Sequence, residues 1–247
     1  FFSGAHYADI TGEGTPELIL LITNPQTGTQ VRSWTLGPGY TTKTPLHEPY
    51  YIKTKQKASE VVSSEIDALY QDKDYELAIC FGSPERKAVI IDYRGELNTK
   101  VIAKKFLENN VGPIELRTKD LNNDGRSDIY ILSNGAIKEE KIYYAPEFKP
   151  SESKIINIKE KIRDLYFISN TEGTMLKILL LKNENLYVEK WEKYFPTEEQ
   201  GSHKIIGHNE KDFFVLTKKG DIFTYNIDEN NKNIKKTKKT PSSFTTQ

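Results

Sequence analysis

Five short apolar runs are distributed along the chain, and turn-forming residues such as Ser133-Asn134-Gly135 close each of them. The runs are Leu18–Ile22, Leu77–Phe81, Ile129–Leu132, Leu176–Leu181 and Phe213–Leu216. Short apolar runs that end in such residues are typical of buried strands. The pattern therefore predicts an all-β protein with a buried strand in each of five segments.

Further strands are predicted beside these runs by alternation or by a turn. These strands are Gln30–Leu36, the hairpin Ala88–Tyr93 with Glu96–Ile102, Ile114–Arg117, Ile137–Tyr144, Leu186–Trp191 and Asp221–Ile227. Period-two alternation is what a half-buried strand requires, and glycine turns favour hairpins. Lys104–Val111 is the best helical candidate, and Ser151–Lys161 fits a strand or a linker.

The five segments behave as repeats. Aligned positions at the start of the runs hold Glu17, Glu76, Asp128, Lys177 and Asp212, at spacings of 59, 52, 49 and 35 residues. A drifting period of about 50 residues suits propeller blades or a similar β-array. We predict a repeat domain over residues 1–230, with units of about 1–50, 51–112, 113–158, 159–201 and 202–230.

Residues 231–247 differ in composition from the repeats. Apolar side chains nearly vanish there and lysines gather at 232, 235, 236, 238 and 239. Such a composition favours a disordered, basic polar tail. The alternative is a partner-binding extension.

The third segment carries the most specific motif, D-L-N-N-D-G-R-S-D. Oxygen-bearing side chains stand at Asp120, Asn122, Asp124 and Asp128, with Gly125 after the third. Alternating oxygens around a glycine can surround a hard cation such as Ca²⁺, and glycine permits the turn. The motif is not an EF-hand, because the twelfth position is Ile131 rather than glutamate. An Asx-rich turn without metal is the alternative.

Looser copies of this loop precede other apolar runs. Residues 9–17 place Asp9, Thr11, Glu13 and Glu17 on the aligned positions, whereas residues 67–76 lack the glycine and carry one extra residue. Threonine is a weaker ligand and glutamate a longer one, so we expect no full metal site at 9–17. We predict that the loop at 67–76 is metal-free.

The pattern D-x-N-x-D-G-x-x-D followed by a strand resembles the calcium loop of FG-GAP repeats of the VCBS, integrin-α-like type. The resemblance implies a β-propeller with Ca²⁺ held by Asp120, Asn122, Asp124, Asp128 and the Arg126 carbonyl. It leaves the Arg126 side chain free to point outwards. Propellers of this family are longer than the chain. The chain is therefore either part of a propeller or one with fewer blades, about five being recognisable.

Composition narrows the class of partner. Lysine plus arginine and aspartate plus glutamate both number 35, which gives no global attraction to nucleic acid. Cys80 is the one cysteine and cannot form an intrachain disulfide; we expect it to be a buried small hydrophobe. The longest apolar runs are too short to insert into a membrane. The chain opens at Phe1 without methionine, so we expect a processed or partial chain.

No catalytic motif accompanies the repeats. His6, His47, His203 and His208 are scattered, and neither nucleophile-elbow nor phosphate-loop glycine patterns occur. We expect a non-enzymatic recognition or adhesion protein, extracellular or on the cell surface, whether secreted or periplasmic. It would bind a protein or a glycan. The alternatives are a structural subunit of an envelope or surface complex, and a propeller-type polysaccharide lyase or hydrolase or its accessory domain.

Overall fold

The protein is built of antiparallel sheets. The computed structural model describes residues 2–24, 26–36, 43–52, 61–70, 72–82, 86–104, 114–169, 175–197, 202–209 and 212–240. Within these ranges there is no α-helix, and no helix with the length and hydropathy needed to cross a bilayer. Residues 1–157 form one compact unit and residues 158–247 a second.

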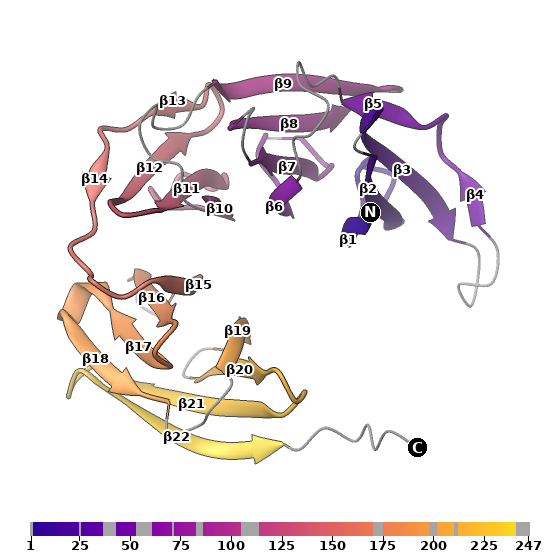
Figure 1. Ribbon diagram of the computed structural model, residues 1–247. Coiled ribbons are helices and arrows are strands. Elements are labelled where there is room, and N and C mark those ends of the chain that lie inside the picture. Colours follow the sequence, from indigo (N-terminus) through magenta and orange to yellow (C-terminus); the bar gives the residue numbers. More distant parts are fainter. Residues whose placement is uncertain are drawn as a thin grey trace. The chain divides into compact units, whose positions relative to one another are not determined.

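Three sheets make up the first unit (Figure 1). The first contains β1 (Phe2–Ala8), β2 (Glu17–Asn24), β3 (Gly28–Leu36), β4 (Lys43–Pro45) and β5 (Tyr50–Ile52). The second contains β6 (Val61–Asp67), β7 (Glu76–Phe81), β8 (Lys87–Tyr93) and β9 (Leu97–Lys104). The third contains β10 (Ile114–Lys119), β11 (Asp128–Asn134), β12 (Lys138–Tyr144), β13 (Lys149–Pro150) and β14 (Lys154–Ile155).

Two sheets make up the second unit. The fourth sheet contains β15 (Ile162–Ser169), β16 (Met175–Leu181), β17 (Asn185–Val188) and β18 (Lys193–Pro196), with the 3-10 turn η2 (Glu189–Trp191) after β17. The fifth contains β19 (Ser202–His208), β20 (Asp212–Thr217), β21 (Ile222–Asp228) and β22 (Asn233–Thr240). In every sheet the first four strands lie side by side in chain order, which is the simplest antiparallel connectivity, and the short strands β5 and β14 pair with β3 and β12.

The predicted apolar runs are the second strands of the five sheets, and in β7, β11 and β16 their composition follows from burial on both faces. In β7, Leu77, Ile79 and Phe81 pack in the core shared with the first sheet, whereas Ala78 and Cys80 pack in the core shared with the third. Because side chains alternate between faces, a strand covered on both sides must be apolar throughout. Cys80 is buried and unpaired by disulfide, as predicted.

Polar contacts also join the innermost strands of the first unit. His6 Nε2 lies 2.9 Å from Ser64 Oγ, and Ser63 Oγ lies 3.1 Å from the backbone oxygen of Leu116. Arg117 Nη1 lies 3.1 Å from a carboxylate oxygen of Glu65. Neighbouring sheets are thus linked along β1, β6 and β10 as well as through their cores.

The prediction of a disordered tail is wrong for Asn233–Thr240, which form the outer strand β22 of the fifth sheet. Ile234 is buried in the second unit's core, and the Lys236 and Lys239 ammonium groups lie 5.4 and 5.3 Å from the centre of the Phe223 ring. Lysine stems can cover apolar surface while the charge stays in water, so the composition is compatible with an edge strand. Residues 241–247 lie outside the described residues.

Smaller predictions also change. Lys104 ends β9, and the rest of the helical candidate 104–111 lies outside the described residues. The strand predicted over Leu186–Trp191 ends at Val188, because η2 turns the chain at Glu189. Within Ser151–Lys161, only Lys154–Ile155 pair as a strand.

Candidate functional site: a row of acidic loops

Three second strands begin with a buried acid. Glu17, Glu76 and Asp128 open β2, β7 and β11, and none of the three is more than 1% exposed. Each carboxylate accepts the backbone N–H of the residue seven positions earlier. These bonds come from Ile10 at 2.9 Å, Leu69 at 2.6 Å and Leu121 at 3.0 Å. The repeated acid therefore fastens the start of each loop to the strand that follows it.

The three loops are also joined to one another. The N–H of Tyr75 donates to the carbonyl of Asp9 at 2.9 Å, and the N–H of Ser127 donates to that of Ala68 at 3.0 Å. A Cβ atom added to Gly12 would lie 3.4 Å from Lys73, so the first two loops are in close contact. We call the described residues of 9–16, 68–75 and 120–127 the loop row.

The first and third loops close in the same way, which confirms that they are copies. Asp9 accepts the N–H of Glu13 at 3.2 Å and of Gly14 at 2.6 Å. Asp120 accepts the N–H of Asp124 at 3.2 Å and of Gly125 at 2.9 Å. Gly14 and Gly125 have φ angles of 82° and 86°, a left-handed conformation that glycine adopts without strain.

The predicted ligands in the third loop lie together, but their oxygens act as backbone acceptors. Asn122 Oδ1 accepts the N–H of Asp124 at 3.1 Å, and Asp124 Oδ1 accepts that of Arg126 at 3.0 Å. Both oxygens of Asp128 are engaged, by the N–H groups of Leu121 and Ala145.

The carboxylates of Asp120, Asp124 and Asp128 do not form a group whose oxygens converge within metal-binding distance. Calcium at this loop stays a prediction. The Arg126 side chain is half-buried rather than pointing outwards, and its Nε is buried.

A different set of carboxylates converges in the second loop. Oxygens of Asp72, Asp74 and Glu76 lie within 4.8 Å of one another, the one such group of three among the described residues. Burial raises the pKa of Glu76 to about 8, and the charges of Asp72 and Asp74 add to the shift, while the bond from the Leu69 N–H opposes it. Burial and the hydrogen bond with Asp72 raise the pKa of Asp74 to about 6.

The loop row also exposes aromatic rings. Tyr75 lies within the row and is 42% exposed, and Tyr7 lies on β1 just before it and is 49% exposed. The sequence of the row holds six acids, Asp9, Glu13, Asp72, Asp74, Asp120 and Asp124, against the two bases Lys73 and Arg126. The row therefore combines negative charge with exposed tyrosine on a chain whose net charge is zero.

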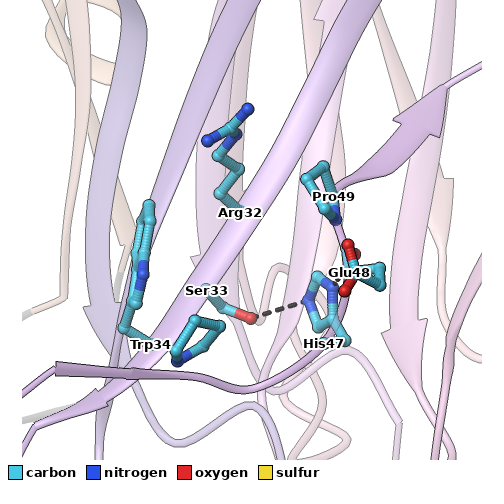
Figure 2. Close-up of a pocket in the computed structure, with 7 residues that line it drawn as sticks. Arg32, Ser33, Trp34, His47, Glu48 and Pro49 are labelled. Carbon is cyan, nitrogen blue, oxygen red and sulfur yellow. Dashed lines mark hydrogen bonds between the residues drawn. The ribbon is translucent and has the colours of Figure 1, made fainter.

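A separate pocket of about 380 Å³ lies between β3 and the segment that follows β4. Figure 2 shows Arg32 and Trp34 on one side and His47, Glu48 and Pro49 on the other, with Ser33 bonded to His47 between them. An indole, a guanidinium and a carboxylate around a hollow are typical of a small polar ligand's site. Sequence reasoning missed this pocket, because it depends on residues 14 positions apart in the chain.

The hydrogen bond between Ser33 and His47 pairs the same groups as a catalytic serine and its histidine base, but the Ser33 side chain is buried. Ser33 Oγ lies 2.7 Å from His47 Nε2, and His47 Nδ1 donates to the carbonyl of Glu48. Nε2 must then accept the serine proton, as in nucleophilic catalysis. Ser33 lines the pocket but is only 1% exposed, so its side chain is almost completely covered.

In the part of the second unit that the structure describes, the aligned positions make other contacts. At the aligned positions, Lys177 pairs with Glu189 at 2.5 Å, and Asp212 accepts the side-chain amide of Asn226 at 3.0 Å. The loop between β15 and β16 lies outside the described residues. Among the described residues, the acidic loops therefore belong to the first three sheets.

Comparison with known proteins gives a fold but no family. No protein-family model and no curated protein match the chain. The resemblance to FG-GAP repeats stays a prediction.

Solved structures do match. The crystal structure of BBS1N in complex with ARL6DN, soaked with mercury, superposes with a TM-score of 0.62 at 11% identity, over 97% of this chain and 68% of that one. The crystal structure of Saccharomyces cerevisiae Sqt1 gives a TM-score of 0.62 at 13% identity, over 95% of this chain and 60% of that one. A functionally unknown protein from Desulfotomaculum acetoxidans gives 0.56 at 11%, over 96% of this chain and 70% of that one. BBS1N and Sqt1 are β-propeller proteins, and the predicted β-propeller fold class is confirmed.

Proposed function

We propose that the chain is a non-catalytic recognition protein whose loop row binds a basic segment of a protein partner. The observation that carries this proposal is the hydrogen-bonded series of three acidic loops with Tyr75 exposed among them. Tyrosine and arginine are enriched where protein interfaces concentrate their binding energy. An acidic row with an exposed tyrosine is complementary to arginine or lysine side chains, which also stack on aromatic faces.

The likeness to BBS1N adds support of a limited kind. BBS1N was crystallised in complex with ARL6DN, so a protein of this fold has a protein partner. At 11% identity the likeness transfers the fold and not the partner. The argument for binding therefore rests on the loop row itself.

We also propose that the protein acts at the cell surface or in the extracellular space. Its role there would be in adhesion or within a surface assembly. The support for this proposal is the resemblance of Asp120–Asp128 to FG-GAP loops. Calcium held by Asp120, Asn122, Asp124, Asp128 and the Arg126 carbonyl would add stability to the folded state only. Binding by the loop row does not depend on that ion.

The proposal predicts that an arginine-rich peptide binds the full chain, with an affinity that falls as salt rises. Tyr75→Ala is expected to weaken binding about tenfold, because a central exposed aromatic contributes about 1 to 2 kcal/mol at an interface. Titration calorimetry against the peptide and its glutamate-for-arginine counterpart measures this. Tyr51→Ala is the matched control, since Tyr51 is equally exposed but lies on β5.

Two double variants distinguish binding by the loop row from a general attraction of the basic peptide to negative charge on the chain. Glu13→Gln with Asp124→Asn should weaken peptide binding, whereas Glu152→Gln with Glu192→Gln removes the same charge outside the row and should not. Equal loss in both pairs would show that the attraction is non-specific. Unchanged binding in Tyr75→Ala and in the first pair would exclude the loop row.

The pocket beside β3 favours a second candidate function, glycan binding. Sugars stack on indole rings and hydrogen-bond to charged side chains, and Trp34, Arg32 and Glu48 offer both around about 380 Å³. We expect Trp34→Ala to abolish any glycan-array signal of the full chain, whereas Tyr75→Ala preserves it. A signal that survives Trp34→Ala would place glycan binding elsewhere.

A further inference from the structure

Glu76 has an oxygen atom whose burial is not compensated. Its Oε2 accepts the N–H of Leu69 at 2.6 Å and of Tyr70 at 3.2 Å. Its Oε1 is buried and has no hydrogen-bond partner among the described residues. A buried carboxylate oxygen without a partner is costly, so such an atom in a native fold calls for a ligand.

The surroundings of Glu76 supply the rest of a coordination shell. Asp72, Asp74 and Glu76 each offer an oxygen, and these oxygens lie within 4.8 Å of one another. Two oxygens on opposite sides of a Ca²⁺ ion are about 4.8 Å apart, because each bond is about 2.4 Å. Asp72 is exposed, Asp74 half-buried and Glu76 buried, which leaves a route from solvent to the innermost ligand.

Protein cations do not neutralise this group in the described structure. The guanidinium of Arg94 lies 6.0 Å from the centre of the Tyr70 ring and is paired with Asp92 at 2.7 Å, and Lys100 Nζ lies 5.6 Å from the centre of the same ring. Asp92 is itself buried, its Oδ1 has no hydrogen-bond partner, and its charge acts on Asp74. Of the carboxylates of Asp72, Asp74, Glu76 and Asp92, only that of Asp92 has an ion-pair partner among the described residues, and a divalent cation would offset the repulsion of the others.

Whereas the sequence pattern predicts a metal-free loop at 67–76, we propose that Asp72, Asp74 and Glu76 bind one hard divalent cation of the size of Ca²⁺. Oxygen-only ligands favour such a cation over zinc or copper. The site differs from the FG-GAP arrangement, because Ala68, Tyr70 and Lys73 stand where that pattern has its first acid, its second oxygen ligand and its glycine. Asp74 contributes a side-chain carboxylate where the pattern uses a backbone carbonyl.

The cation would connect the exposed end of the second loop to the buried start of β7. Tyr75 lies between two of its ligands and donates its N–H to the first loop. Occupancy would therefore hold the middle of the loop row in one conformation. The proposal stands without the proposed function, since it concerns the metal alone.

The test is to titrate the metal-stripped full chain with CaCl2 and to measure binding by calorimetry. In a second titration, Tb³⁺ replaces Ca²⁺, and its emission on excitation of Tyr70 and Tyr75 is measured. We expect Asp72→Asn to weaken Ca²⁺ binding by at least about tenfold, since affinity follows the number of charged ligands. Asp72 is exposed, so this variant should fold as the wild type does. Glu76→Gln should abolish binding, with circular dichroism confirming its fold.

Asp124→Asn is the matched control, because it removes a carboxylate of the third loop. Binding that survives Asp124→Asn and fails in Asp72→Asn supports the site, as does loss of one of two sites in Asp72→Asn. Binding that fails only in Asp124→Asn would overturn the proposal and place calcium at Asp120–Asp128. No binding to the wild type would overturn it as well.

Discussion

Asp128→Ala is expected to lower the free energy of unfolding by about 3 to 5 kcal/mol, since it removes two charge-assisted hydrogen bonds at a fully buried position. The carboxylate accepts the N–H of Leu121 in the loop row and the N–H of Ala145 after β12. Alanine leaves the Ala145 donor buried without an acceptor. Chemical denaturation followed by circular dichroism measures the change.

Asp124→Ala is the control from the same loop. Asp124 is exposed and accepts the N–H of Arg126, so its removal should cost less than about 1 kcal/mol. Repeating both measurements with a chelator separates the backbone role of Asp128 from a metal role. Equal destabilisation by both variants, present only with Ca²⁺, would mean that the loop is held by the ion and not by these hydrogen bonds.

Ending the chain at Asn230 is expected to destabilise the second unit by about 4 kcal/mol or more, because it removes β22. Ile234 leaves the core, and the stems of Lys236 and Lys239 leave the Phe223 ring. Hydrogen exchange at β20 and β21 should rise sharply, which mass spectrometry detects in the peptides that cover residues 212–228.

Lys235→Ser with Lys238→Ser is the control for the truncation. Both lysines are exposed on the strand, so the substitutions remove charge and keep the backbone pairing with β21. Their effect should stay within about 1 kcal/mol. If the truncated chain were as stable as the full chain, β22 would not contribute to stability, and the disordered tail that composition predicts would be the better description.

Most strands could be predicted because the local pattern of apolar and polar residues determines where a strand forms. A strand covered on both faces must be apolar, and the runs of β7 and β11 are uninterrupted in the sequence, whereas Lys177 interrupts the run of β16. The buried acids that open β2, β7 and β11 were visible too, although their partners, the N–H groups of Ile10, Leu69 and Leu121, were not. β22 escaped prediction because Ile234 is its one apolar residue and the other contacts come from lysine stems.

The sites were less predictable because they depend on distant or unusual pairings. The pocket at Trp34 needs β3 and the segment around His47 to meet. The carboxylates of Asp72, Asp74 and Glu76 are adjacent in the sequence, but they depart from the glycine-containing loop pattern, and only the fold shows that Glu76 Oε1 is buried without a partner. The pattern predicts Asp120, Asn122, Asp124 and Asp128 as metal ligands, and in the structure these side chains accept hydrogen bonds from backbone N–H groups.

The proposed function depends on the three loops forming one connected row, and amide hydrogen exchange by NMR tests this most directly. The N–H groups of Tyr75 and Ser127 donate to the neighbouring loops, so they should exchange slowly although they lie outside the strands. The N–H groups of Lys73 and Asn123, which make no such bond, should exchange near the rate of an open chain. Fast exchange at Tyr75 and Ser127 would show that the loops move independently and would contradict the account.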